Sequence, residues 1–374
     1  MTSNDTLRQI LDLARWAPSG DNTQPWRFQI VDSRHVVVHG FDTREHCVYD
    51  LDGHPSQISI GALLETTSIA ASKHGLRVQA CRRADSPVTN PVFDLHFYSD
   101  PSVVTSPLCD SIERRSVQRR PLSMRTLTDG ERQALNTAAG PKHDVIWLEG
   151  PRRRLQAALL MFHSAKLRLT MPEAYEVHRD IIEWNAQFSR DRVPDQALGT
   201  DPGTTRLMQF VMHDWKRVEF FNRYLAGTWA PRIQLDLLPS LACAAHFVIC
   251  AKAVPKDIDD YIEAGRTVQR FWLTATSLGL QLQPEVTPLV FARYAREQRT
   301  FSKVPGMSDK AAEVGASLDR TIGASTAHLA VFMGRIGAGR PARARSIRKP
   351  LSELLMSDLG ASDTRASTAK PGQH

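Results

Sequence analysis

The sequence has no closely spaced cysteines. Its five cysteines (Cys47, Cys81, Cys109, Cys243 and Cys250) form no C-x-x-C pair and show no metal-site spacing. Disulfide-stapled and zinc-binding domains depend on such spacing. We therefore expect a reducing compartment, no disulfide framework and no metal site.

Long hydrophobic runs are also missing. The longest apolar stretch, near residues 237–251, is interrupted by Pro239, Ser240 and His246. The N-terminus carries Asp5 and Asp12 within a helical pattern, where a signal peptide would have an apolar core. We expect a soluble cytoplasmic protein without a membrane span or a membrane partner.

The common hydrolase and nucleotide-binding motifs do not occur. There is no H-E-x-x-H or G-x-S-x-G sequence, and the glycine run GRIGAGR at 334–340 lacks the strand-then-helix context of a phosphate-binding loop. The histidines fall outside any paired motif, so they are interpreted as packing or surface residues. We therefore expect no side-chain nucleophile.

Positive charge is present in excess and is clustered. Lys and Arg number 47 against 40 Asp and Glu, a formal net charge of +7. The clusters are Arg114, Arg115, Arg119 and Arg120, then 152–154, and then 335–349. Such clusters form solvated faces, pockets for a small phosphate or nucleic-acid footprints. No aromatic-interleaved basic stripe or nucleic-acid module occurs, so we rank nucleic acid last and expect a small-molecule substrate.

The chain of 374 residues, 42% hydrophobic and 23% charged, is long enough for one large core or two smaller ones. Apolar periodicity predicts helices at the N-terminus and over 58–74, 128–139, 152–169 and 258–278, and a helical segment around 109–115. Runs rich in β-branched residues predict strands over 27–31, 35–39, 78–81, 92–98, 145–148, 246–251 and 327–333. This order indicates an α+β fold with helices flanking antiparallel or mixed sheets.

A connector near residues 99–108, marked by Pro101 and Pro107, divides the chain. We expect a first half over 1–105, a second half over 106–356 with a lid-like insertion at about 184–235, and a disordered tail over 357–374. Each half contains a long apolar helix, a glycine stop and a short extended run, at 58–79 and 263–284. The sequence therefore predicts a duplication on the scale of a domain.

Four separated stretches resemble the nitroreductase family of flavoproteins. They are ARWAPSGDNTQPWRF (14–28), IERRSVQRRPL (112–122), TATSLGLQLQPEVTP (274–288) and ARSIRKPLSELL (344–355). The usual member carries RRSxR and then APSxxNxQPW in one short chain, and two chains form a dimer with two FMN sites at their interface. Here APSGDNTQPW lies in the first half and RRSVQ in the second.

Each half thus lacks the motif that the other half retains. This arrangement resembles the tandem members of the family, in which two nitroreductase-like halves form an intramolecular pseudo-dimer. The resemblance implies a nitroreductase-like α+β fold with one surviving FMN site, in a monomer or a further homodimer. It also implies that NADH or NADPH is the electron donor and that flavin N5 carries the chemistry, so no catalytic side chain is expected.

The resemblance also implies which residues bind FMN. Phosphate and ribityl contacts fall on Arg114, Arg115, Ser116, Ser346 and Arg348. Gln118 stands where the family has a second basic residue, for which Arg119 or Arg345 would substitute. Contacts to the isoalloxazine fall on Pro18, Ser19, Gly20, Asn22 and Gln24, and the segment beside N5 is Pro284, Glu285 and Val286.

Three functions remain open at this point. The first is an NAD(P)H oxidoreductase acting by ping-pong hydride transfer on a nitroaromatic, a quinone or a specialised organic acceptor. The second is a flavin-sequestering protein with a lidded site, and the third is a biosynthetic flavin-dependent dehydrogenase. If the aromatic residues Trp184, Trp215, Phe221 and Trp229 cover the flavin, sequestration is favoured; if they pack elsewhere, turnover is favoured.

Overall fold

The computed structural model describes residues 3–225 and 227–356 and has the expected mixed α+β architecture. The expected tail, 357–374, lies outside the described residues. None of the described helices is long and apolar enough to cross a membrane.

The first half contains a four-stranded antiparallel sheet in the order β1-β2-β4-β3. Its strands are β1 (Trp26–Asp32), β2 (His35–Gly40), β3 (Leu76–Arg82) and β4 (Val92–Ser99). Helix α1 (Asn4–Ala14) precedes β1, and α2 (His54–Ser72) joins β2 to β3. Helix α1 is capped by the Ser3 hydroxyl and buries Leu7, Ile10, Leu11 and Ala14, the apolar positions of its helical period.

The second half repeats this arrangement. Its antiparallel sheet has the order β5-β9-β11-β10, formed by β5 (His143–Glu149), β9 (Ala245–Ala251), β10 (Leu280–Pro284) and β11 (Ala330–Ala338). Helix α3 (Asp129–Ala139), which begins with a Thr128–Glu131 capping box, precedes β5, and α10 (Ile258–Ser277) joins β9 to β10. The two halves therefore share element order and strand order.

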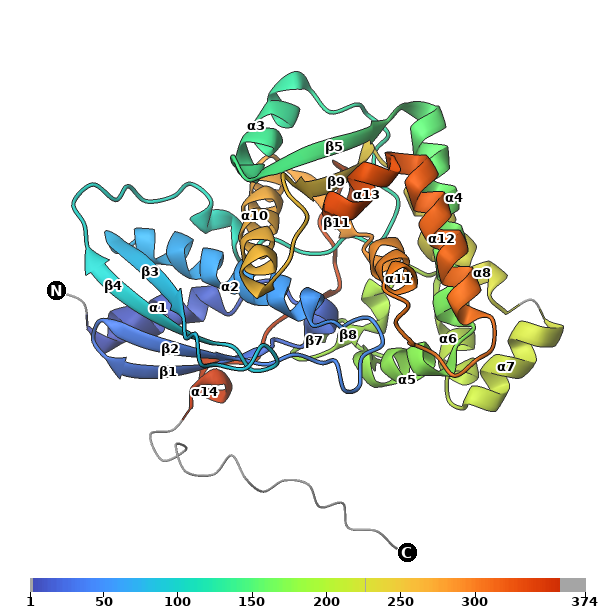
Figure 1. Ribbon diagram of the computed structural model, residues 1–374, viewed down its shortest axis with the longest axis horizontal. Helices are drawn as coiled ribbons and strands as arrows, with labels where there is room; N and C mark the ends of the chain where they lie inside the picture. The colour runs from blue at the N-terminus through green and yellow to red at the C-terminus, as the bar shows by residue number, and fades with distance from the viewer. Residues whose placement is uncertain (1–2, 226, 357–374) are drawn as a thin grey trace, which may run out of the picture.

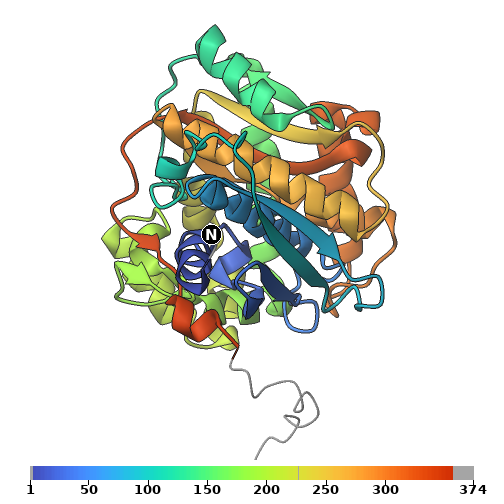
Figure 2. The same ribbon diagram turned by 90° about the vertical axis from the view of Figure 1, so that its left-hand side faces the viewer.

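Helices α2 and α10 pack against each other between the two sheets (Figures 1 and 2). Gly61 and Gly265 form their contact, because a Cβ on Gly61 would overlap the Ile262 carbonyl and a Cβ on Gly265 would overlap the Ile58 carbonyl. The contact is thus reciprocal, as across a twofold axis. A buried hydrogen bond from Gln269 Nε2 to Thr66 Oγ1, 2.9 Å long, joins the same two helices.

The halves differ in the connection between their first two strands. A short turn joins β1 to β2, whereas a long insertion separates β5 from β9. Its helices are α4 (Gly150–Leu169), α5 (Pro172–Ile181), α6 (Pro202–Val211), α7 (Trp215–Tyr224), α8 (Trp229–Pro231) and α9 (Leu238–Leu241). Its shorter elements are β6 (Ile182–Glu183), β7 (Phe188–Ser189), β8 (Val193–Pro194), η3 (Asp195–Ala197) and η4 (Arg232–Leu237).

The C-terminal segment returns from the second half to the first. After α11 (Thr287–Arg296), α12 (Met307–Ile322), α13 (Ala324–Leu329) and β11, the short strand β12 (Arg345–Ser346) pairs with β7. Helix α14 (Leu351–Leu354) then packs beside β1, where Leu355 forms a bridge with Phe28 (Figure 1). This crossing brings residues 345–348 close to the loop after α1.

Two sequence expectations are wrong in detail. The segment around 109–115 forms only a short 3₁₀ turn, η2 (Cys109–Ser111), because the following residues run beside β10. There Val117 bridges Leu282, and the Gln118 amide donates to the Leu282 carbonyl at 3.0 Å. The strand expected over 327–333 begins only at Ala330, after α13.

Candidate functional site

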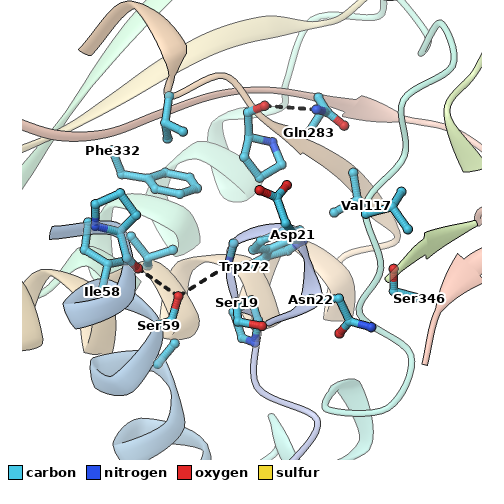
Figure 3. A pocket seen from close by; sticks show the side chains of 18 of the residues that line it. Ser19, Asp21, Asn22, Ile58, Ser59, Val117, Trp272, Gln283, Phe332 and Ser346 are labelled. Atoms are coloured by element: carbon cyan, nitrogen blue, oxygen red, sulfur yellow. Dashed lines mark hydrogen bonds between the residues drawn. The ribbon is translucent and has the colours of Figure 1, made fainter. Parts of the chain in front are cut away.

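A cavity of about 310 Å³ lies where the two halves meet (Figure 3). The first half contributes the loop over 18–22 and the N-terminal part of α2. The second half contributes residues 115–117 and 119, α10, the β10–α11 junction, α11, β11 and residues 345, 346 and 348. The volume lies in the range of small-molecule sites.

The APSGDNTQPW loop is strained and firmly anchored. Asp21, Asn22 and Gln24 have φ values of 49°, 62° and 50°, in the left-handed region that non-glycine residues rarely adopt. The Gln24 amide donates to the Ser19 hydroxyl at 3.0 Å, and its side chain accepts from the Lys349 amide at 3.0 Å. The Asn22 side chain donates to the Ile347 carbonyl at 3.1 Å. The motif therefore fixes a strained turn against the C-terminal segment at the cavity wall.

Three arginines gather at this wall without carboxylate partners. Arg348 donates to the Ala17 carbonyl and the Asn22 side chain, Arg115 to the Trp16 carbonyl and Arg345 to the Arg115 carbonyl. Among the described residues none of these three guanidiniums forms an ion pair. The Nε atoms of Arg115 and Arg345 are buried and have no hydrogen-bond partner within residues 3–225 and 227–356.

Burial and mutual repulsion destabilise the charges of this cluster. Burial, and then the neighbouring arginines, lower the pKa of Arg115 and bring the pKa of Arg348 down to about 9. Burial also lowers the pKa of Arg345, an effect that Glu113 partly offsets. Uncompensated buried charge is costly, whereas an anion with several acceptor oxygens would satisfy it. The cluster therefore fits a phosphate group.

The rest of the cavity is largely apolar and suits a flat aromatic ring. The apolar side chains come from α2, α10, α11 and β11, and include Ile58, Ala62, Val268, Trp272, Val286, Leu289, Val290, Val331 and Phe332. Ser19, Ser59, Gln283 and Ser346 add polar groups (Figure 3). Ser116 is a further polar lining residue. A charged cluster beside an apolar slot matches the two ends of a flavin mononucleotide, so the residues present fit FMN.

The structure brings together most of the residues that the sequence singled out. Those that line the cavity are Pro18, Ser19, Gly20, Asn22, Arg115, Ser116, Pro284, Val286, Ser346 and Arg348. Arg114, Gln118, Gln24 and Glu285 do not line it. Arg114 is exposed, and Gln24 and Gln118 are buried side chains that bond neighbouring backbone, Gln118 to the Arg340 carbonyl at 2.8 Å.

Glu285 belongs to a buried ionic network behind the cavity. Its Oε2 lies 2.6 Å from His246 Nδ1, and its Oε1 accepts from the Ser240 hydroxyl at 3.0 Å and lies 3.6 Å from Arg335 Nε. Burial opposes protonation of His246, but the Glu285 carboxylate outweighs it and raises the pKa of His246 to about 10. Arg335 also donates to the carbonyls of residues 118–120. The network therefore ties β11 to the segment that carries Arg115.

Sequence reasoning did not select several cavity residues. Asp21, His54, Arg119, Trp272, Arg293, Phe332 and Arg345 all line the cavity. Arg119 and Arg345 entered only as substitutes for the basic residue missing at Gln118, and Asp21 lay inside the APSGDNTQPW loop. His54, Arg293, Trp272 and Phe332 carried no local signal, since only the packing of the halves brings them together.

The aromatic residues of the insertion lie away from the cavity. Trp184, Trp215, Phe221 and Trp229 are not among the lining residues; Trp215 packs on Tyr175, and Trp229 packs on Phe162, with ring centroids 5.4 and 5.7 Å apart. Helix α7 lies at the edge of the molecule (Figure 1). The insertion contributes Val193 and Ala197 to the cavity wall.

Comparisons with known proteins agree with the motifs in the first segment. Residues 2–57, which contain the APSGDNTQPW loop, match the model of the Nitroreductase family. No curated protein matches the chain. Two solved structures show a distant likeness, each covering 68% of this chain and 97% of the other. One is a nitroreductase-like family protein from Bacillus cereus, with 14% identity and a TM-score of 0.33. The other is a putative nitroreductase in complex with FMN from Desulfovibrio desulfuricans, with 15% identity and a TM-score of 0.30.

Proposed function

We propose that this chain, of the nitroreductase family by the sequence of its residues 2–57, is an FMN-dependent oxidoreductase. Electrons would pass from NADH or NADPH to a nitroaromatic, a quinone or a specialised organic acceptor. The observation that carries the proposal is the cluster of Arg115, Arg345 and Arg348 without carboxylate partners, at one side of an apolar cavity.

Each part of the cavity has a role in this account. The three arginines bind the FMN phosphate, with the hydroxyl of Ser116 as a further donor, whereas the Ser346 hydroxyl donates to the Arg192 carbonyl. Backbone of the strained loop over 18–22 and the side chains of Trp272 and Phe332 orient the ring and exclude water. When bound, FMN supplies hydride transfer at its N5 atom, so the chain needs no nucleophile.

One flavin per chain follows from the asymmetry of the halves. The packing of α2 on α10 pairs Gly61 with Gly265 and Ile58 with Ile262, so Ser59 and Ala62 correspond to Glu263 and Arg266. The two cavity-lining residues are thus replaced by charged side chains at the equivalent position. There Glu65 pairs with Arg266 and Arg270 at 3.5 and 3.0 Å, and Arg270 also lies 3.7 Å from Glu263. Ion pairs therefore occupy the place of a second site, and the chain acts as a pseudo-dimer with a single site.

The packing of the insertion favours turnover over sequestration. A lid that keeps nicotinamide from the flavin would need bulky side chains at the cavity. None of Trp184, Trp215, Phe221 and Trp229 lines it, and Trp215 and Trp229 pack on other aromatic rings. The cavity wall that the insertion does provide consists of the small residues Val193 and Ala197.

Flavin titration of Arg348→Ala tests the proposal. Loss of hydrogen bonds to a charged group costs about 1.5–3 kcal/mol, so the FMN dissociation constant should rise by roughly 10-fold or more. Arg120→Ala, an exposed arginine of the same chain segment that does not line the cavity, is the control and should bind FMN as wild type does. Binding is followed by quenching of flavin fluorescence. Wild-type protein that binds riboflavin as tightly as FMN would contradict the phosphate assignment.

A further inference from the structure

Asp21 is the one acidic residue among the described residues that line the cavity. Its carboxylate points into the cavity, between the side chains of Phe332 and Val117 in the view of Figure 3. The remaining charged lining residues are cationic or can become so. The Asp21 carboxyl group therefore has a different chemical role from the arginine cluster.

The backbone fixes the position of this carboxyl group. Asp21 has φ 49° and ψ 21°, and its neighbours Asn22 and Gln24 are also left-handed. Asn22 is held by the Ile347 carbonyl and Gln24 by the Arg190 carbonyl at 2.9 Å. A strained turn anchored on both sides presents the carboxyl to the cavity in one orientation.

The carboxyl group has no hydrogen bond or ion pair with the described residues. Burial raises the pKa of Asp21, the charge of Arg119 opposes this, and Asp50 adds to it. The other titratable or charged groups that face Asp21 or share its cavity are Cys47, Tyr49, His54, Arg115, Arg293, Arg345 and Arg348. Arg293 is already paired with Asp52, at 2.6 Å. The Asp21 carboxyl is therefore available to a ligand.

We propose that Asp21 is the proton donor to acceptors whose reduced form carries a new O–H bond, as quinones do. The inference rests on the proposed function. Two-electron reduction of a quinone adds a hydride equivalent, whose electrons come from NAD(P)H, and one proton. The O–H bond of Asp21 breaks, an O–H bond forms on the hydroquinone, and Arg119 stabilises the remaining carboxylate until solvent reprotonates it. Asp21 is then a catalytic residue.

The proton transfer is tested by comparing how fast two oxidants reoxidise the flavin in wild type and in Asp21→Asn. Protein reduced anaerobically with NADPH is mixed with benzoquinone, which takes electrons and protons, or with ferricyanide, which takes electrons alone. Asp21→Asn should slow flavin reoxidation by benzoquinone by about 10²-fold or more and leave ferricyanide reoxidation and flavin content unchanged. In wild type, the rate of flavin reoxidation by benzoquinone should fall as pH rises through the pKa of Asp21. This decrease should be absent in Asp21→Asn. Asp144→Asn, an exposed carboxyl on β5, is the control.

A second measurement does not depend on activity. Folding raises the pKa of this carboxyl group, so its contribution to the stability of the folded state declines as pH rises above about 3.9, the pKa of Asp in the unfolded chain. Urea unfolding of wild type should show this decline, and Asp21→Asn should lack it. Equal quinone rates in Asp21→Asn and Asp144→Asn, or identical pH profiles of stability in wild type and Asp21→Asn, would overturn the inference. Absence of bound flavin in every variant would instead refute the proposed function on which it rests.

Discussion

At the scale of single residues, the charged side chains of the site differ in whether a partner of opposite charge compensates them. Arg115, Arg345 and Arg348 donate to carbonyls and to an amide, so their charges remain uncompensated within the described chain. By contrast, the Glu285 carboxylate is compensated by the positive charges of His246 and Arg335. Its backbone N–H is also used, by the Met333 carbonyl at 2.8 Å. The arginines are therefore available to a ligand, and Glu285 holds the scaffold behind them.

The motifs contain residues of the cavity wall, but they could not distinguish residues that line the cavity from residues that support its wall. Gln24 and Glu285 belong to the same short motifs as Ser19 and Pro284, yet their side chains point into the protein. A linear motif records spacing, whereas the direction of a side chain depends on the turn and on the partners it finds. The role of Asp21 could not be derived for the same reason.

The Glu285–His246 pair predicts a pH dependence of stability. Because the folded-state pKa of His246 is raised to about 10, the pair stabilises the fold fully below the unfolded value of about 6.5. This contribution is lost as pH rises through about 10. Glu285→Gln should lower the free energy of unfolding by about 3 kcal/mol at pH 6 and flatten the decline between pH 6.5 and 10. Urea denaturation at several pH values measures both effects.

The matched control is Glu297→Gln, whose carboxylate pairs with Arg299 on the surface. An exposed pair contributes little, so this variant should unfold as wild type does at each pH. If Glu285→Gln behaved like Glu297→Gln, His246 would not be an imidazolium in the folded state.

Among the helices and strands, those with a strong local period were predictable. The strand β9 and the helix α10 agree with the sequence expectation to within one residue at each end, since burial on both faces or one apolar stripe sets their composition. Residues around 109–115 were expected to be helical, yet only a short 3₁₀ turn forms at 109–111 before residues 117 and 118 pair with β10. Helices α6 and α7 bury none of their residues, so no apolar period pointed to them.

The contact between α2 and α10 predicts strict limits on side-chain size. Gly61→Ala or Gly265→Ala would drive a methyl group into a backbone carbonyl of the partner helix. Each should lower the free energy of unfolding by about 3 kcal/mol, because backbone atoms cannot move aside as a flexible side chain can. Thermal and urea unfolding measure the loss.

Gly130→Ala is the matched control, since Gly130 lies in helix α3 and a Cβ there meets no atom within 4 Å. Alanine favours a helix, so this variant should be as stable as wild type or slightly more stable. Equal stability of Gly61→Ala and Gly130→Ala would show that α2 and α10 are not packed as described.

The whole molecule is two similar halves that share one cavity. Both sheets have the same strand order, α2 and α10 meet through reciprocal glycines, and residues 345–348 return to the first half. The sequence predicted the duplication from the long apolar helix, glycine stop and short extended run that recur at 58–79 and 263–284. It could not show the ion pairs of Arg266 and Arg270 with Glu65, because these pairs join the two halves.

The most direct test of one flavin site per chain is the visible absorption spectrum of purified protein saturated with FMN and freed of excess. Flavin per chain is quantified, and NADPH or NADH is then added without oxygen. We predict one flavin per chain, bleached by the nicotinamide and restored by a quinone. A chain that retains no FMN, or retains two, would contradict the account, and a bound flavin that stays oxidised would show a binding protein without turnover.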